Sequence, residues 1–551
     1  MKVITDPASL LLIGIISLPV LFYLVKPSPR RPRRYPVPLT DEELIKQGFS
    51  PKKLPEHIDI IVIGSGIGGL TVASALAQEG KRVVVLEQHD VAGGNTHTFE
   101  EKGFEFDTGL HYIGGCLDNK HRPTRQLFDF LTNHGVEFQR LGDIVDVVVA
   151  EGPSQARDEV HIAASHEELR AQLKTKFPLD HAAIDTFFKL SREASASFRY
   201  LFGLQLVPQW LRGLYRWWYR RHFQLMSTRT KEVLESITTN PALRGAYYPI
   251  GGPSVIAKAF SRVIESYGGK VLVRAPVSSL LVSPDGAAIG VTVKGHDVYA
   301  PVVISSIGAP LTYTTLVPQP HQHRVKHLTE EFLGKESLQS PCSLMSLFIG
   351  FKTPRAPLPL HNLWKYQTWD HDANFSANRA DPNAPFSALF MSFPSAKDPT
   401  YAARHPERHV ALVIGANFYE HVEAFKDGRV KHRGPEYEAL KAGWKARLLD
   451  EFLAEFPQVD RASVVFTELG TALTNDYYLG NYKGAIYGLG HTPERFASDI
   501  INPRTPIANL YLTGQDVVSC GIVGAMFGGL TTAAVVSPAF FKRLGSLMTP
   551  S

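Results

Sequence analysis

The residues with the clearest chemical meaning are glycines that follow a short apolar run near the N-terminus. The run Ile58–Ile63 leads directly into Gly64-Ser65-Gly66-Ile67-Gly68-Gly69, a G-x-G-x-x-G pattern. In this pattern Gly64 permits a tight turn, Gly66 lets the backbone approach a pyrophosphate, and Gly69 allows a helix to pack closely on a strand. The first turn of that helix presents free N–H groups and a positive dipole end to phosphate. We therefore predict that these glycines bind a dinucleotide.

The elements around the glycines complete a βαβ unit. The apolar run before them is typical of a buried parallel strand, and a helical pattern extends from Leu70 to Glu79. A second buried strand, Arg82–Leu86, closes on Glu87. A carboxylate at this position accepts ribose hydroxyls and repels a 2′-phosphate. We predict that Glu87 and the adjacent Gln88 belong to the cofactor site.

Small residues elsewhere distinguish between FAD and NAD(H). A glycine pair follows Glu87 by six residues and suits a second backbone approach to the cofactor. Near the C-terminus, Asn509–Asp516 is typical of a strand, a turn and an acid, and a small-residue helix, Leu530–Val536, follows. The start of such a helix can stabilise negative charge on a flavin ring. An extended FAD needs both ends of the chain and NAD(H) does not, so we predict FAD. The alternative for the C-terminal segment is a tightly packed core helix. The residues added to the predicted site are Gly93, Gly94, Gly514, Asp516, Gly521 and Gly524.

Four long motifs resemble those of the phytoene desaturase–amine oxidase superfamily of flavoproteins, and within it the branch of retinol saturases and carotenoid isomerases. They are Val62–Gly114, Tyr248–Leu280, Thr471–Phe496 and Asn509–Gly529. The resemblance implies that the first glycines and Glu87 bind the ADP half of FAD. It also implies that Val277 touches the adenine through its backbone and that Asp516 contacts the ribityl chain.

The resemblance also implies a reaction and a substrate class. Saturation of one C=C bond of a polyene, most simply of all-trans-retinol at the 13,14 bond, needs a hydride from reduced flavin at one carbon and a proton at the other. His111 and Tyr112 lie soon after the first glycines and are candidate proton donors, although a packing or hydrogen-bonding pair is the alternative. The competing functions are cis–trans isomerisation or desaturation of a carotenoid, and non-catalytic escort of a prenyl group.

The electron donor is not identified by any motif. A single G-x-G-x-x-G pattern stands in a complete βαβ context. NAD(P)H could bind without such a fingerprint, or a separate electron-donor protein could supply the electrons. Both alternatives stay open.

The net charge of +5 lies wholly at the N-terminus. Residues 1–40 carry six bases and one acid, and the remainder of the 551 residues is balanced at 52 of each. A balanced body excludes a nucleic-acid binder. Cys116, Cys342 and Cys520 are far apart and form no CxxC pair, which excludes a disulfide scaffold and a thiolate zinc site, and we predict no metal.

A membrane anchor is expected beside this charge. Ala8–Val25 is an uncharged stretch of 18 residues that spans about 27 Å as a helix, close to the thickness of a hydrocarbon core. A cleaved signal peptide and an interfacial segment are the alternatives. The basic run Lys26–Arg34 predicts a cytosolic body on the endoplasmic reticulum membrane, and glycosylation of the sequon at Asn374 would overturn that orientation.

A cluster of aromatic and basic residues over 196–226 suits a membrane interface. Tryptophans and arginines alternate there at helical spacing, a pattern typical of a helix that lies at the bilayer surface. A buried aromatic helix whose arginines reach to the surface is the alternative. The cluster contains Trp210, Trp217 and Trp218 with Arg212, Arg216, Arg220 and Arg221.

These observations predict an α/β chain in which a Rossmann-like FAD-binding domain is interleaved with a mixed α+β substrate domain, preceded by a transmembrane helix. The predicted order is a membrane anchor, 1–26, and a basic, proline-rich linker, 27–55. The FAD-binding domain is predicted in the three pieces 56–150, 246–312 and 501–545, and the substrate domain in the two pieces 151–245 and 313–500.

Overall fold

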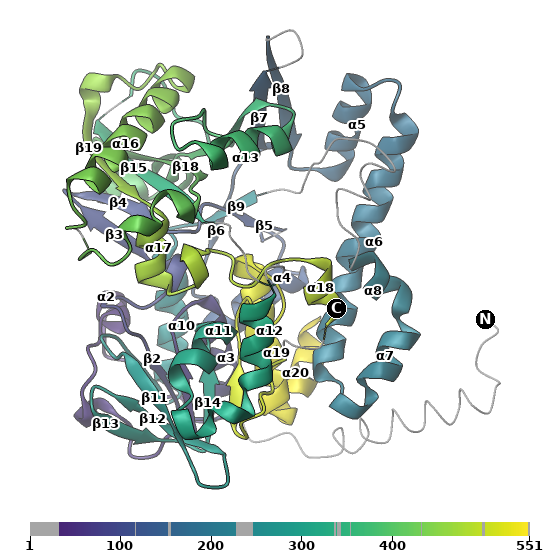
Figure 1. Ribbon diagram of the computed structural model, residues 1–551, viewed down its shortest axis with the longest axis vertical. Helices are drawn as coiled ribbons and strands as arrows, with labels where there is room; N and C mark the ends of the chain where they lie inside the picture. Colours follow the sequence, from purple (N-terminus) through teal and green to yellow (C-terminus); the bar gives the residue numbers. More distant parts are fainter. Residues whose placement is uncertain are drawn as a thin grey trace, which may run out of the picture.

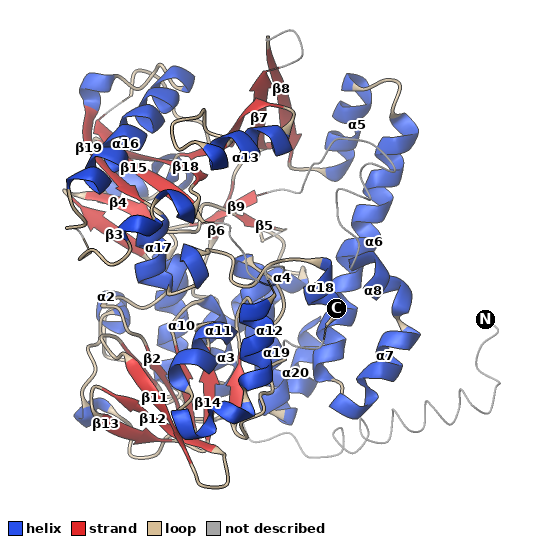
Figure 2. Ribbon diagram, in the orientation of Figure 1, coloured by secondary structure: helices blue, strands red, loops and turns tan. Residues whose placement is uncertain are grey.

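The structure is a computed structural model that describes most of the chain after its first 31 residues. The described residues are 32–115, 117–151, 156–226, 246–335, 338, 343–352, 354–430, 432–498 and 502–548. None of the helices in these ranges is long and apolar enough to cross a membrane. The predicted anchor lies outside them. Two groups of strands, one in each half of the molecule, form the frame, and a set of helices lies along one side (Figures 1 and 2).

The lower half in Figure 1 is built on a five-stranded parallel sheet of order β10-β2-β1-β14-β20. Its central strands are short and buried on both faces, as expected of parallel strands covered on both sides. The strands come from widely separated parts of the chain, and all of them pair in parallel, which confirms the α/β class. They are β1 Ile60–Ile63, β2 Val83–Leu86, β10 Lys270–Leu272, β14 Val302–Ser305 and β20 Leu510–Leu512.

Each face of this sheet has its own cover. Ile60 and Val62 face a core shared with α3 (Ile67–Ala77), α10 (Ser254–Ser266) and α19 (Gly521–Val536). Ile61 and Ile63 face the opposite core, formed with a three-stranded antiparallel sheet. That sheet consists of β11 Val277–Val282, β12 Ala288–Val293 and β13 His296–Tyr299.

The upper half is built on a seven-stranded mixed sheet of order β19-β15-β18-β17-β16-β7-β8. The long helix α16 (Pro435–Glu455) buries Trp444 and Phe452 against it. The strands are β7 Ile144–Glu151, β8 Arg157–Ala163, β15 Leu344–Lys352, β16 Asn362–Thr368, β17 Ala388–Ser392, β18 Arg408–Ala416 and β19 Val464–Gly470.

One domain boundary differs from the prediction. Residues up to 150 were assigned to the nucleotide-binding domain, but β7 pairs in parallel with β16 and antiparallel with β8 in the seven-stranded sheet. The boundary therefore falls before β7. An apolar strand does not show in its own sequence which sheet it joins, because parallel pairing is made with residues more than 200 positions away.

Two small sheets and a helical arm join the halves. The ribbon β3–β4 and the sheet β5-β9-β6 lie between the large sheets, and α5 to α8 form the arm (Figure 1). Their bounds are β3 Thr98–Glu101, β4 Phe104–Asp107, β5 Ile113–Gly114, β6 Phe138–Arg140, β9 Ala246–Pro249, α5 His166–Lys176, α6 His181–Leu206, α7 Arg212–Trp218 and α8 Arg220–Met226. The remaining helices are α2 Asp41–Ile45, α4 Pro123–Thr132, α11 Ala309–Leu311, α12 Lys326–Gly334, α13 His371–Ala380, α14 Pro394–Lys397, α15 Tyr401–Arg404, α17 Ala472–Leu479, α18 Pro493–Ala497 and α20 Pro538–Met548.

Candidate cofactor and reaction site

The glycine loop between β1 and α3 has the geometry that a dinucleotide needs. Gly64 has a φ of +93°, and a Cβ added at Gly69 would lie 2.2 Å from the Gly64 carbonyl oxygen, so neither position accepts a larger residue. At Gly66, in contrast, a Cβ would meet nothing within 4 Å. Gly66 is the N-cap of α3, and within the described chain no side chain caps that helix end. The open space in front of Gly66 is where a pyrophosphate could approach.

Glu87 holds the loop to the end of β2. One carboxylate oxygen accepts the Ser65 backbone N–H at 2.9 Å and the Ser65 hydroxyl at 2.7 Å, and the other accepts the His89 N–H at 3.0 Å. The Ser65 hydroxyl in turn accepts the N–H of Gly93 at 2.9 Å. A carboxylate offers about four acceptor positions, so one remains for a ribose hydroxyl. Sequence reasoning missed Ser65, which looked like a spacer between two glycines.

The other residues predicted for the adenosine side lie at this same end of the sheet. A Cβ at Gly94 would lie 3.0 Å from Gly66 Cα, which places the glycine pair against the loop. The Ala275 N–H donates to the Glu87 carbonyl at 2.7 Å, which brings the start of β11, Val277, close by. Gln88 is exposed. The contacts of these residues with a cofactor stay predictions.

The C-terminal segment packs directly on the glycine loop. A Cβ at Gly68 would lie 2.5 Å from Gly514 Cα, and one at Gly528 would lie 2.1 Å from the Gly514 carbonyl oxygen. A Cβ added at Gly524 would lie 2.3 Å from the Ser519 carbonyl oxygen, so this position is equally confined. Gly521, the first residue of α19, has a φ of +77°, and a Cβ added there would meet no atom within 4 Å. The two helix starts predicted to hold opposite ends of a cofactor are therefore neighbours, and both are open in front.

Asp516 has a structural role that the sequence did not reveal. One carboxylate oxygen accepts the Ala309 N–H at 2.9 Å and the other accepts the Leu489 N–H at 3.0 Å. The carboxylate thus ties two loops to the end of β20. Its ribityl contact stays a prediction.

A buried arginine that sequence reasoning missed supports this region. Arg495 donates to the carbonyls of Leu489, Gln515 and Asp516 at 2.8 to 2.9 Å. A lone arginine in a short helix, α18, gives no local signal, because the carbonyls that it binds are up to 21 positions away.

His111 and Tyr112 lie in the turn between β4 and β5, against an aromatic group on the upper sheet. The Phe390 ring centroid is 5.5 Å from that of His111 and 6.4 Å from that of Tyr112, and Trp364 packs on Phe390 at 4.9 Å. Burial lowers the pKa of His111 to about 3 and raises that of Tyr112. Both side chains are therefore neutral at physiological pH and can each donate a hydrogen. The His111 Nδ1 atom is buried and has no hydrogen-bond partner among the described residues.

A buried polar cluster that the sequence did not predict lies behind this turn. The Lys397 ammonium group, 1% exposed, donates to the His111 carbonyl oxygen at 3.0 Å and to the Ser392 hydroxyl at 2.7 Å. It also donates to the side-chain oxygen of Asn362, whose amide donates to Asp146 at 2.8 Å. Nearby, Tyr248 donates to Asp107 at 2.6 Å, and burial raises the pKa of that carboxyl to about 8. The bond from Tyr248 gives Asp107 a structural role.

The aromatic and basic cluster on the helical arm is divided between two faces. Trp210, Trp217 and Trp218 are 73%, 60% and 51% exposed. Arg212, in contrast, is buried, and Arg216 donates to the carbonyls of Phe496 and Ser498. Because those two arginines pack inward, they do not belong to an exposed basic face.

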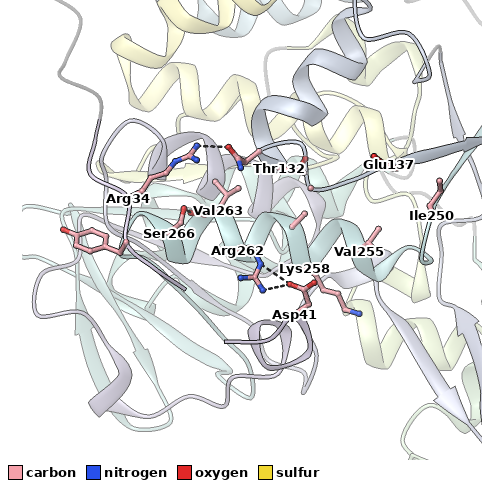
Figure 3. A pocket seen from close by; sticks show the side chains of 14 residues that line it. Arg34, Asp41, Thr132, Glu137, Ile250, Val255, Lys258, Arg262, Val263 and Ser266 are labelled. Carbon is pink, nitrogen blue, oxygen red and sulfur yellow. Dashed lines mark hydrogen bonds and ion pairs between the residues drawn. The ribbon is translucent and has the colours of Figure 1, made fainter. Parts of the chain in front are cut away.

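A surface hollow of about 520 Å³ lies away from the predicted site, over α10 and the end of α4 (Figure 3). Its charged groups satisfy one another: Arg262 binds Asp41 at 2.6 Å, Lys258 binds Glu42 at 2.5 Å, and Arg34 donates to Asn133 at 2.8 Å. The hollow marks where the segment before α2 is fastened to the domain, and most of its charged groups are paired within the fold. Among the described residues no cluster of three or more His, Cys, Asp or Glu could hold a metal ion.

Comparison with solved structures defines the fold class. The chain matches an oxidoreductase from Methanosarcina mazei with a TM-score of 0.53 at 17% identity, over 86% of this chain and 99% of that one. It matches putrescine oxidase bound to putrescine with a TM-score of 0.52 at 17% identity, over 87% and 99%. Residues 62–131 match the NAD(P)-binding Rossmann-like domain family. The fold is that of an α/β protein with a Rossmann-like nucleotide-binding domain.

Comparison with curated sequences is more specific. The chain is 34% identical over 545 residues to all-trans-retinol 13,14-reductase of Danio rerio, which covers 90% of this chain and 88% of the relative. The chain therefore belongs to the all-trans-retinol 13,14-reductase family. A second Danio rerio member, an inactive all-trans-retinol 13,14-reductase, is 32% identical over 90% and 88%. A prolycopene isomerase of an Oncidium hybrid is more distant, 26% identical over 87% and 83%.

Proposed function

We propose that this protein is an FAD-dependent oxidoreductase that saturates one C=C bond of a polyene, the 13,14 bond of all-trans-retinol. The observation that carries the proposal is the complete cofactor cradle, with open helix starts at Gly66 and Gly521 and a packed contact between Gly68 and Gly514. Membership of the retinol reductase family supports the choice of substrate. FAD is favoured over NAD(H) because the cradle is made from both ends of the chain.

The chain's own residues bind the cofactor and manage the proton. Bound FAD supplies hydride when reduced. The backbone N–H groups at the start of α3 would bind the pyrophosphate, and Glu87 would hold the ribose. The positive dipole end at the start of α19 would stabilise negative charge on the flavin ring. The aromatic rings of Tyr112, Phe390 and Trp364 offer an apolar surface to the polyene, and His111 or Tyr112 donates the proton from a neutral side chain.

The electrons come from NAD(P)H or from a separate donor protein. The single fingerprint loop is taken by the flavin in this proposal, so NAD(P)H would bind without a second G-x-G-x-x-G pattern. The two sources are separated by adding NADH or NADPH to the purified flavoprotein and recording the flavin absorbance. A loss of absorbance would identify NAD(P)H as the donor, and an unchanged absorbance would favour a donor protein.

Membrane attachment forms part of the proposal. The uncharged Ala8–Val25 segment would anchor the chain, and Trp210, Trp217 and Trp218 present an aromatic face that can enter the bilayer surface. A cytosolic body at the endoplasmic reticulum is supported by the basic run Lys26–Arg34 beside the anchor segment. The Asn374 side-chain amide donates to the Thr368 carbonyl at 2.8 Å inside the fold, so an absent glycan at this sequon would fit either orientation.

The membrane face is tested by tryptophan fluorescence of the full chain in vesicles that contain brominated lipids. We expect the bromine to quench the wild type and to quench a Trp217→Ala/Trp218→Ala variant less. A Tyr299→Ala variant, which removes an aromatic side chain that is 60% exposed on β13, serves as the control. Equal quenching of all three proteins would contradict an interfacial role for the tryptophans.

The reaction is tested with the purified, pre-reduced protein and all-trans-retinol under anaerobic conditions. We expect a product heavier than retinol by two hydrogen atoms, together with reoxidation of the flavin. A product of unchanged mass would support the isomerase alternative. A protein that purifies and reconstitutes without flavin absorbance would support the prenyl escort alternative.

A further inference from the structure

Lys397 is buried in a setting that matches a charged ammonium group. The side chain is 1% exposed, and its three N–H donors meet three acceptors: the His111 carbonyl, the Ser392 hydroxyl and the Asn362 side-chain oxygen. An ammonium group has three donors and no acceptor, so each hydrogen is used once. A neutral amine has only two hydrogens, so the lysine could then donate to only two of these three groups.

The contact with His111 is the one that reaches the candidate reaction site. Lys397 and His111 are 286 positions apart, and the 3.0 Å bond runs from α14 on the upper sheet to the turn between β4 and β5. The same ammonium nitrogen is 5.9 Å from the Tyr112 ring centroid. The bond is made to the backbone, so it fixes the path of the turn that carries both candidate proton donors.

We propose that Lys397 is a positioning residue, which in its charged form holds the His111–Tyr112 turn in place for proton delivery. The inference rests on the proposed function and adds to it the group that sets the position of the donor. Lys397 itself does not touch the polyene or the flavin in this proposal.

Charge on Lys397 makes the positioning sensitive to pH. Burial lowers the pKa of Lys397 to about 7, and the nearby acidic groups of Asp146 and Asp107 act to raise it. As pH rises through this value the ammonium loses a proton and the turn loses one of its holding bonds. The groups around Lys397 are Asp146 on β7, Asp107 on β4 with Tyr248 bonded to it, His111, Tyr112, His361, Asn362, Ser392, and Asp398 on its own segment, which is bound by Arg404.

The test compares Lys397→Met with Lys365→Met. Methionine keeps the length of the side chain and removes the donors. Lys365 lies in β16, the strand that also carries Asn362, and binds Glu451 and Glu455, so its variant removes another paired lysine of the upper half, away from the turn. We expect Lys397→Met to retain flavin, to lower the rate of product formation by the reduced protein at least tenfold, and to leave the KM for retinol nearly unchanged. We expect Lys365→Met to retain the wild-type rate.

The pH profile separates positioning from a merely structural effect. The wild-type rate should fall as pH rises through about 7, and Lys397→Met should show no such fall. If Lys397→Met does not fold, Lys397→Met/Asp146→Asn removes the facing negative charge as well and should behave in the same way. The inference would be overturned if the wild-type rate stayed constant across this pH range, or if either Lys397 variant kept the pH profile of the wild type. Failure of the proposed function is distinguishable, because the wild type itself would then form no saturated product.

Discussion

Gly66→Ala is expected to separate cofactor binding from stability. Gly66 has a φ of −60°, which alanine adopts without strain, and its added methyl group meets no protein atom within 4 Å. The free energy of unfolding of the apoprotein should therefore change by less than about 1 kcal/mol. The methyl group would, however, enter the space in front of the α3 start, where the pyrophosphate is proposed to lie.

The expected loss of affinity follows from the bonds at risk. Hydrogen bonds to a charged group contribute about 1.5 to 3 kcal/mol each, so the loss of one corresponds to roughly a 10- to 150-fold weaker binding of FAD. The assay is the flavin-to-protein absorbance ratio after purification, followed by titration of the apoprotein with FAD by flavin fluorescence. Denaturant unfolding of the apoprotein measures stability in parallel.

Gly443→Ala is the matched control. Gly443 lies inside α16, and its added Cβ also meets nothing within 4 Å, but it is remote from the cradle. This variant should bind FAD like the wild type. If Gly66→Ala bound FAD with unchanged affinity, the placement of the pyrophosphate at this loop would be refuted. If the free energy of unfolding of Gly66→Ala were several kcal/mol below that of Gly443→Ala, the space in front of Gly66 would not be open as the structure shows it.

Three further predictions concern packing, proton transfer and acid stability. Gly528→Ala places a methyl group 2.1 Å from the Gly514 carbonyl, so we expect a loss of about 1 to 3 kcal/mol in denaturant unfolding, and an unchanged midpoint would contradict the packed contact. Of Tyr112→Phe and His111→Gln, one should slow product formation by the reduced protein about 100-fold or more while flavin content is kept; wild-type rates in both would exclude them as proton donors. Burial lowers the pKa of His491 to about 4, so the unfolded state binds more protons between that value and its ordinary 6.5, and stability should fall as pH drops through this window. His491→Gln keeps an acceptor for the Cys520 N–H and should weaken that dependence, as chemical unfolding at several pH values would reveal.

The nucleotide-binding unit could be predicted because its signals are local. The predicted helix Leu70–Glu79 corresponds to α3, Ile67–Ala77, and the strand and acid that follow it are where the pattern placed them. In a βαβ unit the strand, turn and helix are consecutive, so apolar runs and glycines suffice to find it. The boundary before β7 could not be found in the same way, because its partner strand β16 lies more than 200 residues further along the chain.

The sequence by itself predicted the chemistry that the chain can offer: a dinucleotide loop, an acid placed for ribose, a second glycine-rich helix start and two candidate proton donors. The tertiary structure decided which of these meet. It placed Gly514 against Gly68, used Asp516 and Arg495 to fasten loops, and set Lys397 against the carbonyl of His111. The physical reason is that a buried polar group must find partners wherever the fold brings them, and a bond between residues 286 positions apart leaves no periodic or spaced pattern in either segment.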